Sequence, residues 1–228
     1  MSPERFARIN SMLDNRQPDL TLCLDKVHKT NNIAAVIRTA DAVGIHQIHA
    51  VWPEIEMRVS GNTASGSQQW VKSIAHNKMS DAVTEFRRQD MQILATNFSA
   101  TAVDFREIDY TRPTAIILGN ERDGVSPEGI ASADQHVIIP MIGMVQSLNV
   151  SVAAALIMYE AQRQRQAAGM YGSRKLDEAY CQVKLFEQGH PIYAKACRRK
   201  KLAYPAIDAA GQIVADELWW QKMRAPSE

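Results

Sequence analysis

Short apolar runs that alternate with amphipathic segments constrain the fold of this chain more than any other feature. Two runs, Gln92–Thr96 and Thr114–Leu118, have the apolar centres typical of strands buried on both faces of a parallel sheet. Strands are also predicted at Leu20–Leu24, Ile45–Trp52, Val71–Ala75 and His136–Ile139. Because helical segments separate these strands, the pattern favours an α/β domain with a mostly parallel sheet.

Helical spacing and end signals place the helices. Asn31–Val43 has helical apolar spacing, and Gly44 is suited to end it. Pro127–Ala133 starts with proline after Ser126, a good capping residue. The other predicted helices cover Pro3–Arg16, Ala82–Arg88, Leu148–Ala168, Lys175–Gln188 and Ile192–Lys201. We therefore expect an N-terminal helical arm over residues 1–19, an α/β domain over residues 20–166 and a basic helical extension over residues 167–228.

Composition excludes several classes of protein. Hydrophobic residues make up 46% of the chain and charged residues 22%, which are ordinary globular values. No run of about 18 apolar residues could span a membrane, and the first residues lack the apolar core of a signal peptide. The three cysteines are scattered and form no CxxC pair, which fits a reducing cytoplasm. We expect a cytoplasmic globular protein.

Charge is distributed unevenly along the chain. Residues 51–160 have eight Lys/Arg and thirteen Asp/Glu, whereas residues 161–228 have twelve and seven. The net charge of these segments is therefore −5 and +5. A basic tail after an acidic centre predicts a polyanion partner near the C-terminus, and a solvated charged helix is the alternative interpretation.

Common catalytic motifs are missing. The chain has no HExxH, GxSxG or GxGxxG, and Val125 stands where a phosphate-binding loop over Gly119–Ser126 would need lysine. His46 and His49 point to opposite faces of their predicted strand, so we expect no metal site there. Trp219 and Trp220 are interpreted as anchors of a helix rather than as a stacking site for a base.

The segment Asn31–Gly44 holds the first candidate side chains. Asn32 and Arg38 are six residues apart, so they lie on different faces of a continuous helix. Arg38 interrupts an apolar run, and a buried cation without a partner is costly. Two interpretations stay open: a structural salt bridge, or a clamp for phosphate, whose oxygens match the guanidinium fork.

Two later segments also place polar residues at strand ends. Asn120 and Glu121 follow the strand that ends at Gly119, at the sheet edge where ligands of parallel sheets bind. Glu121 alone would also fit a surface turn. In Val137–Ala155, a strand and a glycine loop lead to Ser147 and Asn149, either of which fits a helix N-cap.

Taken together, these three segments resemble the signature motifs of the SPOUT superfamily in its SpoU/TrmH branch. They read NNIAAVIRTADAVG, IILGNERDGVS and IPMIGMVQSLNVSVAAA, in the family's order. The resemblance covers nearly the whole chain and is strongest to members that methylate guanosine 18 in the D-loop of tRNA. It implies an α/β sheet with helices on both faces, a C-terminal deep trefoil knot and short helical extensions.

The resemblance also implies a function. The expected reaction is methyl transfer from S-adenosylmethionine to the ribose 2′-hydroxyl of tRNA guanosine 18, by a homodimer with its site at the subunit interface and without a metal. A ribosomal RNA ribose methyltransferase is the alternative within the superfamily. Only about 20 residues precede the α/β domain, which favours tRNA. A non-catalytic RNA-binding module is the alternative from another class.

Site residues follow from the motif positions. Arg38, paired with a substrate phosphate, is expected to position the ribose and assist its deprotonation. Asn32 is expected to orient Arg38 or the ribose, and the remaining catalytic residues shape the site. The implied catalytic residues are Asn32, Arg38, Glu121, Ser147 and Asn149. The implied cofactor-binding residues are Thr96, Leu118, Gly119, Asn120, Ile139, Met141, Ser147 and Leu148. The candidate tRNA-binding residues are Arg8, Arg163 and Arg165.

Overall fold

The computed structural model describes residues 1–51 and 66–225 and divides into two compact units. The larger unit spans residues 17–171, and the smaller one joins residues 1–16 to the segment after residue 171. The structure thus places the N-terminal arm and the C-terminal extension in one unit, whereas the sequence pattern predicts two separate segments. Trp52, the last residue of one predicted strand, lies outside the described residues.

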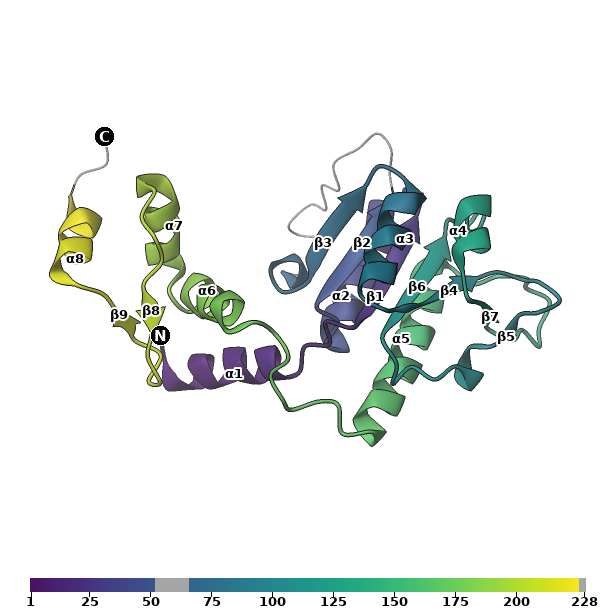
Figure 1. Ribbon diagram of the computed structural model, residues 1–228, viewed down its shortest axis with the longest axis horizontal. Helices are drawn as coiled ribbons and strands as arrows, with labels where there is room; N and C mark the ends of the chain where they lie inside the picture. Colours follow the sequence, from purple (N-terminus) through teal and green to yellow (C-terminus); the bar gives the residue numbers. More distant parts are fainter. Residues whose placement is uncertain (52–65, 226–228) are drawn as a thin grey trace. The chain divides into compact units, whose positions relative to one another are not determined.

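The larger unit is built on a sheet in which every strand pairing is parallel, as predicted (Figure 1). In the described chain its strand order is β3-β2-β1-β6-β4-β7-β5. The strands are β1 (Leu20–Asp25), β2 (Gln47–Val51), β3 (Lys72–His76), β4 (Gln92–Thr96), β5 (Val103–Asp104), β6 (Thr114–Gly119) and β7 (Gln135–Ile138). The parallel α/β fold is confirmed, and the trefoil knot stays a prediction.

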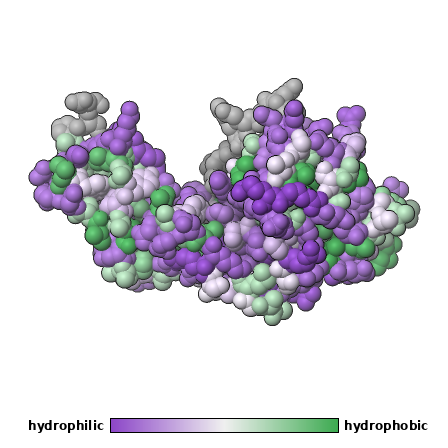
Figure 2. All heavy atoms as spheres, in the orientation of Figure 1, coloured by the Kyte–Doolittle hydropathy of each residue, from purple (hydrophilic) through white to green (hydrophobic). Residues whose placement is uncertain are grey.

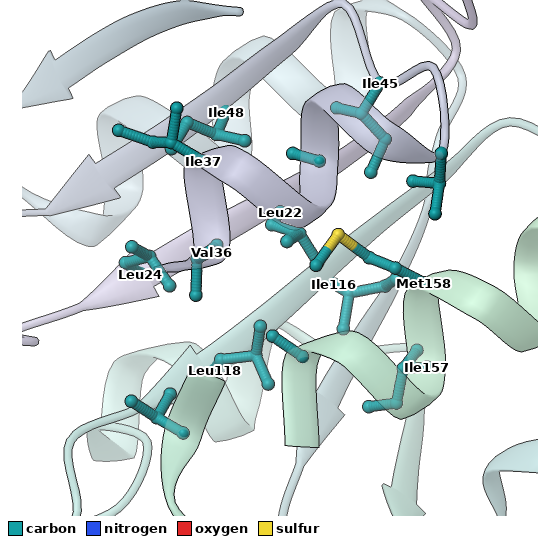
Figure 3. Packing of buried hydrophobic residues seen from close by; sticks show 14 of the residues in the cluster. Leu22, Leu24, Val36, Ile37, Ile45, Ile48, Ile116, Leu118, Ile157 and Met158 are labelled. Carbon is teal, nitrogen blue, oxygen red and sulfur yellow. The ribbon is translucent and has the colours of Figure 1, made fainter. Parts of the chain in front are cut away.

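Helices cover both faces of this sheet. The helices are α2 (Thr30–Ala42), α3 (Met79–Arg88), α4 (Pro127–Ser132) and α5 (Val150–Ala167), with short 3-10 turns η1 (Ser67–Gln69) and η2 (Phe105–Glu107). Leu22 and Ile116 pack against α2 and α5 on one face (Figure 3). Their neighbours Cys23 and Ile117 pack against α3 on the other face. The two-residue period of the strands therefore divides the core into two layers.

The order of the strands brings the candidate motifs to one edge. Strands β1 and β6 pair so that Asp25 lies beside Gly119, and β4 pairs with β7 so that Thr96 lies beside Val137. Because all these strands are parallel, their carboxyl ends meet at the same edge. The loops after β4, β6 and β7 start there, as ligand-binding loops of parallel sheets do.

The smaller unit is mainly helical. It contains α1 (Pro3–Asp14), α6 (Glu178–Gly189), α7 (Pro191–Lys200) and α8 (Glu217–Arg224), with a two-stranded hairpin of β8 (Ala206–Ile207) and β9 (Ile213–Val214). Helix α1 packs against α6, which ties the N-terminal arm to the extension. Trp219 and Trp220 lie in α8, and the Trp219 indole donates to the Ala203 carbonyl at 3.1 Å, in agreement with their interpretation as anchors of a helix. Among the described helices, none is long and apolar enough to cross a membrane.

Candidate active site

The loop after β6 is a tight turn that presents Glu121. A Cβ on Gly119 would lie 1.9 Å from the carbonyl carbon of Gly124, so only glycine fits. The Asn120 carbonyl accepts a hydrogen bond from the Gly124 amide at 3.0 Å. The buried Asn120 side chain accepts from the amides of Arg122 and Asp123 at 2.9 and 2.8 Å. The oxygens of Asn120 therefore accept hydrogen bonds within the turn, and Glu121 is the side chain that the turn presents.

Asp25 anchors the far end of this loop. It is 1% exposed at the end of β1, and its Oδ2 accepts from the Ser126 amide at 2.7 Å. The Ser126 hydroxyl in turn caps α4 by accepting from the Gly129 amide at 3.3 Å, as predicted. Asp25 is not among the site residues predicted from the sequence, although a carboxylate at the end of the apolar strand LTLCLD is a signal for it.

Three of the five expected catalytic residues meet in one cluster. The Asn32 amide of α2 donates a hydrogen bond to Glu121 Oε1. The Asn149 amide donates to Asn32 Oδ1 at 3.2 Å and to Glu121 Oε1 at 3.4 Å. Lys29 adds a positive charge 3.9 Å from the same carboxylate oxygen. Glu121 is therefore held from α2 and from the start of α5, and it is more than a surface turn residue.

Asn149 has two roles at once. Its Oδ1 accepts from the Ser151 amide at 2.9 Å, which makes it the N-cap of α5. Its Nδ2 donates to Asn32 and Glu121 in the cluster. The capping role fixes the amide plane and so orients its donor into the site. Helix α5 begins at Val150, two residues after the predicted start at Leu148, because the N-cap Asn149 lies before the first helical residue.

Arg38 lies apart from this cluster. Its side chain is exposed on α2, so the premise that Arg38 is buried in an apolar run is wrong. Within the described ranges, no hydrogen bond or ion pair is formed by its guanidinium, which disfavours the structural salt bridge. Ser147 is also exposed and lies in the loop before α5. The structure thus brings Asn32, Glu121 and Asn149 together but leaves Arg38 facing solvent.

A cavity of about 820 Å³ opens beside the cluster. This volume is in the range of small-molecule and cofactor sites. Its wall is formed by the loops after β4, β6 and β7 and includes Glu121. All eight expected cofactor-binding residues line it: Thr96, Leu118, Gly119, Asn120, Ile139, Met141, Ser147 and Leu148. Phe98 also lines the cavity and is not among the residues predicted from the sequence; its signal is its place two residues after the end of β4.

The three arginines proposed for RNA differ in their surroundings. Arg8 is exposed on α1, and the Arg163 side chain is 67% exposed with an ion pair to Glu160. Arg165 is 0% exposed and pairs with Asp19 at 2.6 Å. Arg165 is therefore a structural residue, which corrects the expectation that it contacts RNA.

Comparison with known proteins defines the class of protein. A model described as the SpoU rRNA Methylase family matches residues 19–159, and a model described as SpoU, rRNA methylase, C-terminal, matches residues 163–216. The chain belongs to the SpoU methylase family.

Individual relatives are also similar. The tRNA (guanosine(18)-2'-O)-methyltransferase of Escherichia coli K12 is 57% identical over 227 residues, which are 99% of both chains. The crystal structure of the A. aeolicus TrmH/SpoU tRNA modifying enzyme is 40% identical with a TM-score of 0.76, and the match covers 83% of this chain and 96% of that one. The SpoU methyltransferase AviRb from Streptomyces viridochromogenes, in complex with AdoMet, is 29% identical with a TM-score of 0.60, over 66% of this chain and 62% of that one.

Proposed function

We propose that this protein transfers a methyl group from S-adenosylmethionine to the ribose 2′-hydroxyl of guanosine 18 in tRNA. The observation that carries the proposal is the Asn32–Glu121–Asn149 cluster beside a cavity lined by every expected cofactor-binding residue. The full-length similarity to the Escherichia coli enzyme supports the choice of tRNA and of guanosine 18.

The cavity suits the cofactor chemically. Leu118, Ile139 and Met141 provide an apolar wall for an adenine ring, and Thr96 provides a hydroxyl. When bound, S-adenosylmethionine supplies an already activated methyl group on its sulfonium. The AdoMet complex of the similar AviRb supports the same cofactor here.

The protein must then position the ribose hydroxyl and help it lose a proton. Placing the hydroxyl in line with the methyl group is where an enzyme gains most by orientation. We assign Asn32 and Asn149 to holding Glu121, so that its carboxylate faces the ribose in one fixed position. We assign Arg38 to a phosphate of the RNA, which orients the ribose and assists deprotonation. The phosphate contact is its main task, because the planar guanidinium matches the oxygens of a phosphate.

We also propose that the active form is a homodimer. Helix α5 exposes Val152, Leu156 and Tyr159 by 47%, 41% and 52%, and their spacing places them on one face. An apolar helix face in water favours association. Because Asn149 caps the same helix, a second copy on this face would place the site at the interface. The three buried, unpaired cysteines support a place in the reducing cytoplasm.

Methylation of defined transcripts tests the reaction. The purified protein, S-adenosylmethionine and a tRNA transcript should give 2′-O-methylguanosine at position 18 by nuclease digestion and mass spectrometry. A transcript with adenosine at position 18 should accept no methyl group. Equal methylation of both transcripts would contradict the guanosine assignment.

Two alternatives give different outcomes in the same assay. The family description names ribosomal RNA, so a ribosomal RNA ribose methyltransferase remains the second candidate. Methylation of ribosomal RNA fragments without methylation of tRNA would favour it. A non-catalytic RNA-binding module would bind no S-adenosylmethionine in calorimetry. Arg38→Ala should retain cofactor affinity and lose methylation, whereas retained methylation would exclude the proposed role of Arg38.

A further inference from the structure

The loop after β4 presents an aromatic ring to solvent. Phe98 lies two residues after the end of β4 and is 91% exposed. Burial of a phenylalanine ring away from water is favourable, so an exposed ring gains stability when a partner covers it. Single exposed rings are common on protein surfaces, but this one lines the cavity beside the Asn32–Glu121–Asn149 cluster. The ring is therefore available to a ligand of that cavity.

Hydrogen bonds hold the backbone of this loop on both sides of Phe98. The Asn97 amide donates to the Val137 carbonyl of β7 at 3.3 Å. The Ser99 hydroxyl forms a hydrogen bond with His136 Nδ1, also of β7, at 2.9 Å. The residues directly before and after Phe98 are thus tied to the sheet. The backbone that carries the ring is already ordered before a ligand arrives, which lowers the entropic cost of binding.

Two side chains of a second loop add apolar surface around the same cavity. Met144 and Val145 lie in the loop after β7, are 98% and 60% exposed, and line the cavity together with Phe98. We call these three residues the cavity rim. Figure 2 shows hydrophobic residues at the end of the larger unit where Figure 1 places the loops after β4 and β7. Exposed apolar side chains that gather at one cavity mark a binding site, unlike single ones scattered over a surface.

The cavity rim differs from the wall that is assigned to the cofactor. Of the apolar wall residues, Leu118 is buried, and Ile139 and Met141 are half-buried. The rim residues are far more exposed, so they lie between this wall and solvent. A cofactor against the wall leaves the rim for the second substrate. Because an RNA nucleotide enters the cavity from solvent, the rim is the part of the cavity that it meets first.

The chemistry of a nucleotide brings a base to this rim. The reacting hydroxyl is on the C2′ carbon of the ribose, and the base is on the neighbouring C1′ carbon. Glu121 and the rim residues line one cavity, so a ribose presented to Glu121 carries its base into the space that Phe98 borders. A base that leaves the stack of its RNA loses its aromatic neighbours, and proteins replace them with aromatic side chains.

We propose that Phe98 stacks on the guanine of the target nucleotide, and that Met144 and Val145 add apolar contacts around this base. The proposal rests on the proposed function and assigns a substrate-binding residue that the sequence motifs do not include. Stacking fixes the base, and the base in turn fixes the ribose against the Asn32–Glu121–Asn149 cluster. Two other occupants of the rim, the adenine of the cofactor and a second copy of this chain, give different results in the experiment below.

A double-mutant cycle between the ring and the base tests this contact. Wild type and Phe98→Ala are compared for binding of two tRNA transcripts, one with guanosine at position 18 and one with an abasic ribose there, in the presence of S-adenosylhomocysteine. Stacking of a base on an aromatic side chain contributes about fivefold to 150-fold in affinity. Each single change should therefore weaken binding by about tenfold. Because both changes remove the same contact, the two together should also lose about tenfold rather than about 100-fold.

Two further variants serve as controls. Phe98→Trp keeps an aromatic ring, so it should bind the guanosine transcript as wild type does and should still lose about tenfold on removal of the base. Ile142 is fully exposed in the loop after β7 but is not among the described residues that line the cavity. Ile142→Ala should therefore lose as much affinity on removal of the base as wild type does.

Three results would overturn the proposal. The first is additive losses, so that Phe98→Ala still loses about tenfold when the base is removed. The second is weaker binding of S-adenosylmethionine to Phe98→Ala in calorimetry, which would place the cofactor against the ring. The third is a change of oligomeric state in Phe98→Ala by sedimentation, which would place a second copy there. A wild-type protein that does not methylate guanosine 18 of the first transcript would instead refute the proposed function.

Discussion

Replacing Arg165 by methionine measures how much the larger unit depends on one buried cation. The guanidinium pairs with the Asp19 carboxylate at 2.6 Å and donates to Gln17 Oε1 at 3.1 Å. It also donates to the carbonyls of Tyr110 and Arg112 at 2.9 and 3.1 Å. Methionine keeps much of the hydrocarbon volume but removes every donor, so these acceptors lose their partner together.

The expected cost follows from these contacts. Breaking a buried ion pair by removing one partner costs about 3–5 kcal/mol, largely because the other groups stay desolvated. The Asp19 side chain is 31% exposed and can regain water, so we take the lower end of this range, about 3 kcal/mol. Domains unfold with free energies of about 5–15 kcal/mol, so this loss is a large fraction of the total.

Urea unfolding followed by circular dichroism measures this effect. With a slope of about 2 kcal/mol per molar urea, the midpoint of Arg165→Met should fall by about 1.5 M. Arg163→Met, two residues away, removes an exposed cation paired with Glu160 and should cost less than about 0.5 kcal/mol. Equal midpoints for the two variants would refute the argument that burial, rather than charge, makes Arg165 important.

Substitutions at three other positions test the site and the sheet. Gly119→Ala should abolish cofactor binding in calorimetry, because its Cβ would lie 1.9 Å from the Gly124 carbonyl carbon, and unchanged affinity would contradict the tight turn. Asp25→Ala should cost about 1–3 kcal/mol and weaken cofactor binding, because it leaves a buried amide of the loop without an acceptor. Asp25→Asn, which keeps an acceptor, should cost less. Burial and the neighbouring His76 lower the pKa of His49 to about 4, below its ordinary 6.5. His49 is therefore neutral in the fold, and stability should fall by up to about 3 kcal/mol as pH drops from 6.5 to 4, a loss that His49→Leu should reduce.

Much of the larger unit could be predicted because its signals are local. Gln92–Thr96 is both the predicted strand and the observed β4, since a short apolar run between polar segments is typical of a buried strand. The cavity lining followed from motif positions at strand ends, which a parallel sheet gathers at one edge. In contrast, β5 has two residues, Val103 and Asp104, which are too few to form a pattern.

Features that depend on distant contacts could not be predicted. Arg165 looks like a surface cation in the sequence, since arginine is rarely fully buried unless it is paired. Its partner Asp19 is 146 residues away, and nothing near Arg165 in the chain indicates the pairing. Helices α1 and α6, which pack together, are also far apart in the sequence, so the sequence pattern presents the arm and the extension as independent segments.

Helix α2 separates two tasks on two faces. Asn32 is 9% exposed and turned toward Glu121, whereas Arg38 is exposed to solvent. Six residues correspond to a rotation of about 240° around the helix, so no side-chain rotation can bring Arg38 into the same contact as Asn32. A guanidinium that served the protein's own structure would have an acceptor beside it, as Arg165 has Asp19. An arginine that serves a substrate phosphate has no such need, because its partner arrives with the RNA. The exposure of Arg38 therefore favours the phosphate clamp among the interpretations that the sequence left open.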